Sequence, residues 1–145
     1  MDTKDQVVLY VEDNSDYAEL VLRGLARHGL DRPVVHVEDG EAALQYLERS
    51  AAKQAERPYL ILLDLQLPKV DGLEILRTVK EHPALSDIPV VVLTTSARAG
   101  DIRGAYEHHA NSYLVKPDAF AQFDEMIRDL RVYWLTWNHP PVGTH

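Results

Sequence analysis

The sequence predicts one α/β domain with a doubly wound, five-stranded parallel sheet and helices on both faces. Two observations lead to this prediction. Short, continuous apolar runs alternate along the chain with segments whose apolar residues recur at helical spacing. The polar, proline-bearing connectors at residues 50–58 and 81–89 are too short to separate two domains. Strict alternation of strands and helices requires parallel strands joined by right-handed crossovers, which place helices on both faces of the sheet.

Five apolar runs are predicted to form strands that are buried on both faces. They are residues 7–11, 34–37, 59–63, 90–93 and 113–115. The segments between them carry the apolar stripes of helices: Tyr17, Leu20, Val21 and Leu25 before Gly29; Ala43, Leu44 and Leu47; Leu73, Leu76 and Val79 before Pro83; and a weaker pattern at 102–109. A last helix is predicted from about Phe120 to Trp137.

Composition narrows the setting of this domain. The chain has 145 residues, and its 15 basic against 23 acidic residues give a net charge of −8, which disfavours binding to nucleic acid. It has no cysteine for a disulfide or a thiolate site. The start at Met1 is polar, unlike a signal peptide, and no apolar stretch reaches the roughly 18 residues that span a membrane. We therefore expect a cytoplasmic protein that binds neither nucleic acid nor membrane.

Carboxylates follow two of the predicted strands at the points where these strands end. Glu12 and Asp13 come directly after the first strand, and Asp64 follows the third. Since parallel strands end at one edge of the sheet, the three carboxylates should converge and repel one another unless a cation lies among them. Oxygen ligands without His or Cys select Mg²⁺ or a similar ion. With Thr94 and Lys116 at the next two strand ends, Asp64 could accept a phosphoryl group.

Four motifs at these strand ends together resemble the receiver domain of two-component response regulators. The motifs are Val11-Glu12-Asp13-Asn14, Leu63-Asp64-Leu65-Gln66-Leu67-Pro68 with Asp71-Gly72, Val92-Leu93-Thr94-Thr95, and Tyr113-Leu114-Val115-Lys116-Pro117. Each motif alone is common, but four in this order at five-strand spacing are specific. The resemblance covers nearly the whole chain. It implies the flavodoxin-like receiver fold over residues 1–132 and a phosphoacceptor that is not an enzyme in the usual sense.

The resemblance implies roles around the phosphorylation site. Asp64 would be the phosphoacceptor and a metal ligand. Asp13 would bind Mg²⁺ directly, Glu12 would hold the ion through water, and the backbone carbonyl of Gln66 would supply a further oxygen. Thr95 stands where many receivers have Ala, so its larger side chain is expected to narrow access to Asp64.

The resemblance also implies roles for the residues that respond to phosphorylation. Thr94 would be the hydroxyl switch that turns toward the phosphoryl group, and Lys116 the cation that pairs with it. Tyr113 would be the aromatic side chain whose rotamer reports phosphorylation. Pro117 would follow a cis peptide bond, a state almost confined to proline. Gln66 and Ser96 occupy positions that tune hydrolysis, so the lifetime of the phosphoryl group is not implied.

Two alternatives to a phosphorylated receiver are considered. A haloacid-dehalogenase-like phosphatase also uses a strand-end Asp with Mg²⁺. That family, however, carries the motif Asp-x-Asp, in which the second Asp is a general acid. Gln66 occupies that position here and cannot donate a proton as an acid does. A receiver-like scaffold that never takes phosphate stays open at this point.

The C-terminal helix continues its apolar stripe beyond the length usual for receivers. The stripe consists of Phe120, Phe123, Ile127, Leu130, Trp134 and Trp137. Its first part must cover the sheet, but Tyr133, Trp134, Leu135 and Trp137 extend past the core that five strands offer. We expect a homodimer formed by Phe123, Ile127, Leu130, Trp134 and Trp137, with residues 133–145 as a dimerisation extension. The alternative is that this extension folds back on its own domain.

A narrower resemblance concerns the partner. Asn14 after the acidic pair, the run Leu93-Thr94-Thr95-Ser96 and the aromatic C-terminal segment are similar to single-domain response regulators paired with bacterial phytochrome kinases. This similarity implies a sensor histidine kinase, a bacteriophytochrome in particular, as the phosphoryl donor. With no effector domain expected, the output would be binding to another protein or onward transfer of phosphate.

Overall fold

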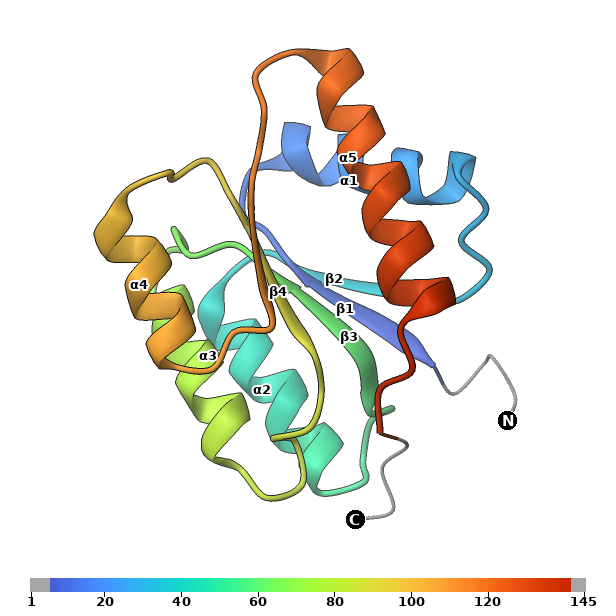
Figure 1. The fold of residues 1–145 in the computed structure, drawn as a ribbon. Coiled ribbons are helices and arrows are strands. Elements are labelled where there is room, and N and C mark those ends of the chain that lie inside the picture. Colours follow the sequence, from blue (N-terminus) through green and yellow to red (C-terminus); the bar gives the residue numbers. More distant parts are fainter. Residues whose placement is uncertain (1–5, 142–145) are drawn as a thin grey trace.

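The protein, here a computed structural model that describes residues 6–141, has the predicted alternation of strands and helices (Figure 1). The strands are β1 (Val7–Val11), β2 (Val34–Val37), β3 (Pro58–Leu63), β4 (Val90–Thr94) and β5 (Ser112–Val115). The helices are α1 (Ser15–Arg27), α2 (Gly40–Ala51), α3 (Gly72–Glu81), α4 (Ala99–Glu107) and α5 (Phe120–Val132), followed by the π-helical turn η2 (Tyr133–Trp137).

The five strands form one parallel sheet in the order β2-β1-β3-β4-β5, as predicted for a doubly wound fold. The chain moves outward from β1 to β2 and then returns to the other side of β1 to form β3. The direction of winding therefore reverses between β1 and β3. In open α/β sheets, ligands bind beyond the carboxyl ends of the strands at such a point.

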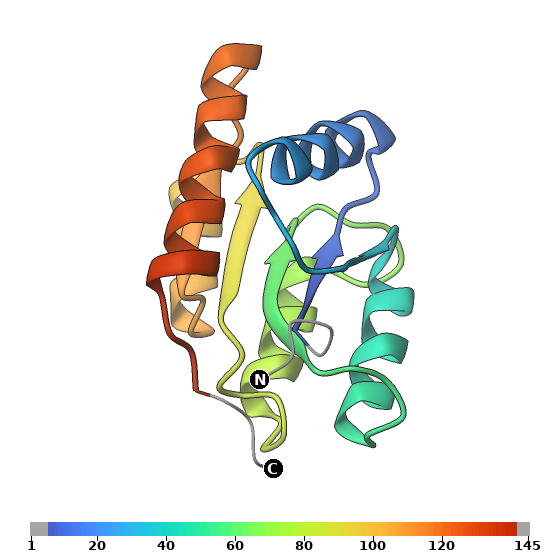
Figure 2. The same cartoon turned by 90° about the vertical axis from the view of Figure 1, so that its right-hand side faces the viewer.

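Helices cover both faces of the sheet (Figures 1 and 2). On one face, α1 and α5 pack against alternate strand residues through Val21, Leu25, Phe123 and Ile127. The other face is covered by α2, α3 and α4. The three central strands are buried on both faces, but β2 and β5 are only half-buried, and Val115 is exposed. The prediction of full burial is therefore wrong for the two edge strands, because each has only one neighbouring strand.

Side chains of the loops after three strands start the next helices. The Asn14 side chain accepts hydrogen bonds from the backbone N–H groups of Asp16 and Tyr17, at 2.9 and 3.0 Å. Asp39 and Asp71 cap α2 and α3 in the same way. Such caps contribute about 1 kcal/mol each. They also fix each helix directly behind a strand end, where the polar residues gather.

The C-terminal segment turns at the end of α5 in a way that the stripe of apolar residues did not predict. The N–H of Asn138 donates to the carbonyl of Tyr133 at 2.7 Å, a bond that spans five residues and widens the turn. This wider turn brings Leu135, which is only 7% exposed, into the core beneath α5, and leaves Trp137 70% exposed. Trp134 packs partly against the same core.

This geometry corrects the expected dimer contacts. Phe123, Ile127 and Leu130 are buried between α5 and the sheet, so they belong to the core of the single chain and are not available to a partner. Leu135 is buried as well, whereas Tyr133 and Trp137 are exposed. The last four residues of the extension, 142–145, lie outside the described residues, as does the polar start at 1–5.

Two further expectations concern the backbone and the membrane. Among residues 6–141 no peptide bond is cis, so the bond before Pro117 is trans and the expected cis bond is wrong. A proline permits the cis form but still favours trans by about 0.5–1 kcal/mol, so its presence alone does not determine the isomer.

No helix in the described part of the chain is both long and apolar enough to cross a membrane.

Candidate functional site

The strand ends bring the predicted site residues together at one edge of the sheet. Glu12 and Asp13 follow β1, and Asp64 follows β3, the neighbouring strand. The N–H of Asp64 donates to the carbonyl of Val11 at 3.1 Å, so the acidic residues of the two strands are in register. In the same way, the N–H of Lys116 donates to the carbonyl of Thr94 at 2.7 Å.

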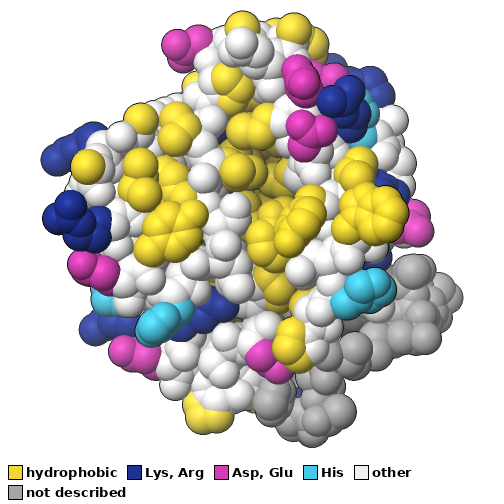
Figure 3. Space-filling view, in the orientation of Figure 1, with side chains coloured by type: hydrophobic (Ala, Val, Ile, Leu, Met, Phe, Trp, Pro, Cys, Tyr) yellow, Lys and Arg dark blue, Asp and Glu magenta, His cyan; other side chains and the backbone are white. Residues whose placement is uncertain are grey.

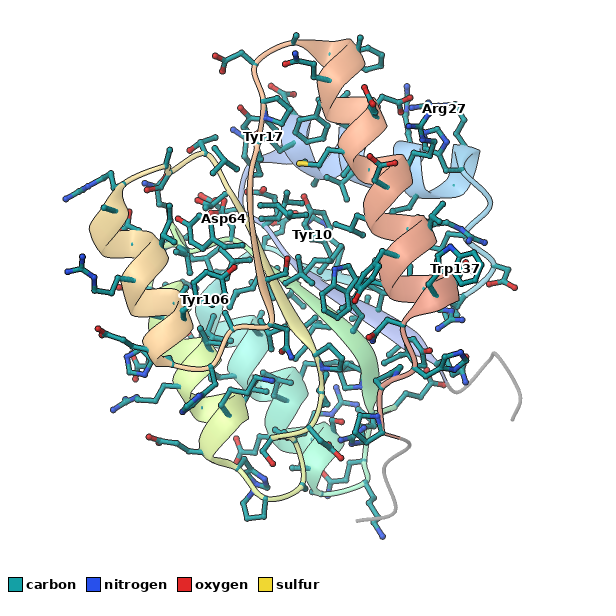
Figure 4. All side chains as sticks on the ribbon, in the orientation of Figure 1. Tyr10, Tyr17, Arg27, Asp64, Tyr106 and Trp137 are labelled. Carbon is teal, nitrogen blue, oxygen red and sulfur yellow. The ribbon has the colours of Figure 1, made fainter. Side chains whose placement is uncertain are left out.

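Glu12, Asp13 and Asp64 form the acidic cluster that the sequence predicts. One carboxylate oxygen from each lies within 4.8 Å of those of the other two. Glu12 and Asp64 are buried, whereas Asp13 is exposed at the mouth of the site. Figure 4 shows Asp64 near the upper end of the sheet. Two buried carboxylates at this spacing require compensating positive charge.

Lys116 supplies part of this charge. Its Nζ forms an ion pair with Glu12 Oε1 and lies 3.4 Å from Asp64 Oδ2. The Lys116 side chain is only 1% exposed, so the ammonium is directed inward and is held by the two buried carboxylates. The sequence predicts Lys116 near Asp64, but the direct pair with Glu12 is found only in the structure.

Burial also changes the proton affinity of the cluster. It raises the pKa of Glu12 to about 7, although the Lys116 ammonium opposes this shift. Tyr10, which is fully buried in β1, directs its hydroxyl toward Glu12 Oε1 at 3.5 Å, and burial raises the pKa of this hydroxyl too. The N–H of Asn14 donates to the other Glu12 oxygen at 3.2 Å. Glu12 is therefore held in place on both oxygens.

The donor atoms fit a divalent cation. Three carboxylates converge within 4.8 Å, and no His or Cys takes part, so the site offers hard oxygen ligands only. The loop after β3 starts with a turn at Asp64, in which the N–H of Gln66 donates to Asp64 Oδ1 at 3.1 Å. This loop also borders an open cleft of about 530 Å³, whose lining includes Asp13, Gln66, Lys69 and Arg98. A phosphorylated side chain could approach the acidic cluster through this cleft.

The predicted switch residues meet at one loop. Thr94 is fully buried, and its hydroxyl accepts a hydrogen bond from the N–H of Ser96 at 3.4 Å. Tyr113 is half-buried and donates its hydroxyl proton to the carbonyl of Ser96 at 2.9 Å. Thr95 Oγ1 lies 3.5 Å from Gln66 Oε1 across the mouth of the site. Ser96 thus connects Thr94 and Tyr113, a link that the sequence does not show.

Tyr17 is a residue of the site that sequence reasoning missed. Its spacing assigned it to the apolar stripe of the first helix. In the structure, the Lys116 ammonium lies 4.1 Å from the centre of the Tyr17 ring. Only its position four residues after Asp13 could have indicated this contact, since the first turn of a helix that follows a strand end lies close to the site.

Gly72, the first residue of α3, permits the close approach of this helix to Asp64. A Cβ atom at Gly72 would lie 2.5 Å from the Asp64 carbonyl oxygen and 2.6 Å from Leu65 Cα. We predict that Gly72→Ala lowers the free energy of unfolding by about 1–3 kcal/mol and slows phosphoryl uptake, because the Asp64 backbone must move. Urea denaturation measures the first effect.

Gly100 provides the matched control. It lies in α4, and among the described residues no heavy atom beyond its chain neighbours and the backbone of its own helix lies within 4 Å of its Cβ position. Gly100 is the second residue of α4, so Gly100→Ala should leave the free energy of unfolding unchanged or raise it by less than about 1 kcal/mol, the gain of alanine over glycine inside a helix. If Gly72→Ala is as well tolerated as Gly100→Ala, the proposed close packing at Asp64 is wrong.

The fold and this site together define the class of protein. Residues 8–128 match the family model described as "Response regulator receiver domain", so the chain belongs to the receiver domain family of response regulators. Among its relatives, the chain is 44% identical to the "Probable methanogenesis regulatory protein FilR2" of Methanothrix harundinacea (strain 6Ac), over 93% of this chain and 87% of that protein.

A second relative has solved structures. The chain is 40% identical to "Response regulator Rcp1" of Synechocystis sp. (strain ATCC 27184 / PCC 6803 / Kazusa), over 90% of this chain and 89% of Rcp1. The Mn²⁺-bound form of Rcp1 superposes with a TM-score of 0.88 at 38% identity, covering 94% of this chain and 99% of that one. The phosphorylated cyanobacterial phytochrome response regulator RcpA matches with the same four values. The metal-bound relative supports a divalent metal ion at the acidic cluster.

Proposed function

We propose that this chain is a response regulator that accepts a phosphoryl group on Asp64 from a sensor histidine kinase and signals by binding another protein. The observation that supports this proposal is the convergence of Glu12, Asp13, Asp64 and Lys116 at one edge of the sheet. A haloacid-dehalogenase-like phosphatase is disfavoured by membership in the receiver family, and by Gln66 in place of a second acid.

The residues present would support phosphoryl transfer as follows. Mg²⁺, held by Asp13, Asp64, the Gln66 carbonyl and, through water, Glu12, would neutralise negative charge on the incoming phosphoryl group. An Asp64 carboxylate oxygen forms the new bond to phosphorus while the bond from phosphorus to the kinase histidine breaks. Lys116, which already lies beside Asp64, pairs with a phosphoryl oxygen.

The hydrogen bonds at Ser96 suggest how phosphorylation would be transmitted. When the Thr94 hydroxyl turns toward the phosphoryl group, it gives up its bond with the Ser96 N–H. The Ser96 loop is then free to move, and with it the carbonyl that holds the Tyr113 hydroxyl. Tyr113 would fill the space that Thr94 leaves. Phosphorylation would thus shift an equilibrium between two arrangements of the loop after β4.

The proposed kinase is a bacteriophytochrome. Its support is the likeness to Rcp1 and to the phytochrome response regulator RcpA over nearly the full length of the chain. FilR2, at higher identity to this chain than Rcp1, is described as a methanogenesis regulator, so the kinase must be found by experiment. Comparing the initial rates at which purified histidine kinases phosphorylate the chain would identify it. A non-phytochrome kinase that reacts fastest would contradict the proposed pairing.

We further propose that the chain forms a homodimer through α5 and the adjoining turn. Figure 3 shows hydrophobic side chains gathered on the face formed by α4, β5 and α5. A groove of about 390 Å³ on this face is lined by Leu114, Met126, Tyr133 and Trp134. Trp137 is exposed, and Figure 4 shows it beside the lower end of α5. Residues 133–145, of which the structure describes 133–141, would thus serve as a dimerisation extension of the receiver domain.

The proposed metal site is tested by Asp13→Ala. This change removes a direct ligand, so we predict that the affinity for Mg²⁺ falls at least tenfold and that phosphorylation by acetyl phosphate at low Mg²⁺ falls in parallel. The second readout is a Mg²⁺ titration monitored by NMR, which does not depend on phosphorylation. Asp129→Ala, which removes an exposed carboxylate from α5, is the control and should leave both unchanged. An unaltered Mg²⁺ affinity in Asp13→Ala would exclude Asp13 as a ligand.

A further inference from the structure

The Tyr17 ring lies between the phosphorylation site and helix α5. The Lys116 ammonium is 4.1 Å from the ring centre. The ring also stacks on Phe123 of α5, with the ring centres 5.8 Å apart and an angle of 16° between the planes. Figure 4 shows Tyr17 at the same end of the molecule as Asp64, beside the start of α5.

Contacts with its neighbours fix the position of Tyr17, so that a movement of the Lys116 ammonium would act on its ring. Its backbone N–H is fixed by the Asn14 cap at 3.0 Å. Phe123 is only 3% exposed and belongs to the core that joins α1 to α5. A cation over an aromatic ring and two stacked rings are both attractive contacts. The Tyr17 ring is therefore coupled both to Lys116 and, through Phe123, to α5.

The contact with Lys116 should differ between the two states of the site. In this structure the ammonium is shared by Glu12, Asp64 and the Tyr17 ring. A phosphoryl group on Asp64 would draw the ammonium toward its oxygens and change its position over the ring. Only such a difference in interaction energy can shift a conformational equilibrium. The contact partners Lys116, Tyr17 and Phe123 form a path that does not pass through Thr94, Ser96 or Tyr113.

We propose that Tyr17 is a positioning residue that holds Lys116 and transmits the occupancy of the site to α5 through Phe123. This inference rests on the proposed acceptance of a phosphoryl group by Asp64. It assigns to the first turn of α1 a part in signalling. Its output is the C-terminal end of α5, where the two tryptophans of the chain, Trp134 and Trp137, lie.

Tryptophan fluorescence provides the readout, because both tryptophans follow α5 directly. The probe is Mg²⁺ with beryllofluoride, which mimics a phosphoryl group on a carboxylate. Its binding is followed separately by ¹⁹F NMR. We expect a saturable fluorescence change in the unmodified chain. Tyr17→Leu should still bind beryllofluoride but lose at least half of the amplitude at saturation, whereas Tyr17→Phe, which keeps the aromatic face, should retain it.

Two further variants separate this role from a general loss of structure. Tyr106→Leu makes the same replacement at an exposed position on α4 and should leave the amplitude unchanged. Phe123→Leu keeps the contact between Tyr17 and Lys116 but removes the stack from the side of α5, so it should lower the amplitude as Tyr17→Leu does. This variant also tests the inference if Tyr17→Leu does not fold.

The outcomes distinguish the inference from the function on which it rests. If the unmodified chain does not bind beryllofluoride, the proposed function fails. If it binds but Tyr17→Leu and Phe123→Leu keep the full amplitude, or if the unmodified chain shows no fluorescence change, the function stands and the path through Tyr17 is wrong. Equal losses in Tyr17→Phe and Tyr17→Leu would also overturn it, because the aromatic face would then be irrelevant.

Discussion

Asp64→Asn is expected to abolish phosphoryl transfer to this chain while leaving it folded. Asparagine has nearly the same shape as aspartate, but its amide is a very poor nucleophile, so the rate from a histidine kinase or acetyl phosphate should fall by roughly 1,000-fold or more. Asp64 is buried next to Lys116 and receives the Gln66 N–H. Glu12, the other buried carboxylate, is already bonded on both oxygens, by Lys116 and by the Asn14 N–H. Mass spectrometry of the intact chain and sensitivity to hydroxylamine would measure the acyl phosphate.

Asp129→Asn makes the same chemical change at an exposed position of α5 and should be phosphorylated at the normal rate. Circular dichroism should show the same fold in both variants. If Asp64→Asn still gains a hydroxylamine-sensitive phosphoryl group at the original rate, another carboxylate is the acceptor. If the unmodified chain gains none from any donor, it is a receiver-like scaffold that does not take phosphate.

The sheet and the acidic cluster could be predicted from the sequence because both depend on short-range patterns. The run that ends at Leu63 is short, apolar and followed by turn residues, as expected of a buried strand, and it delivers Asp64 to the edge of the sheet. Glu12 and Asp13 reach the same edge by the same rule, since β1 and β3 are parallel neighbours. Once the strand order is known, these positions follow without any knowledge of side-chain packing.

Contacts between distant segments could not be predicted in the same way. Tyr17 and Phe123 each fit an apolar helix stripe, and nothing in either stripe indicates that the two rings stack on each other or that one lies under Lys116. The same holds for the ion pair between Lys116 and Glu12, because strand order brings the residues near one another but rotamers decide which groups touch.

The C-terminal segment shows how a small change in helical geometry alters a prediction. A regular α-helix would continue the core stripe from Leu130 to Trp134 and Trp137. The bond from Asn138 to Tyr133 widens the last turn, so Leu135 enters the core instead and Trp137 turns outward. The predicted interface therefore changes from the buried side of the helix to the aromatic side chains on its outer side.

Replacing the two exposed aromatic residues of this segment is expected to convert a dimer into a monomer. Tyr133 is 54% exposed and Trp137 is 70% exposed, and aromatic residues of this kind dominate binding at interfaces. We predict that the intact chain is a dimer at about 50 µM, and that Tyr133→Ser with Trp137→Ser weakens the dimer at least tenfold. Sedimentation velocity over a range of concentrations would measure the change.

The double substitution is a sharper test than truncation before Tyr133, because truncation also removes Leu135 from the core and should destabilise the fold. Phe120→Ser is the matched control: it removes an exposed aromatic residue from the other end of α5 and should leave the dimer intact. If Phe120→Ser weakens the dimer as much as the double substitution does, the interface extends along the whole of α5. A monomeric intact chain at this concentration would exclude the dimer and leave Leu135 and Trp134 as a segment that only folds back on its own domain.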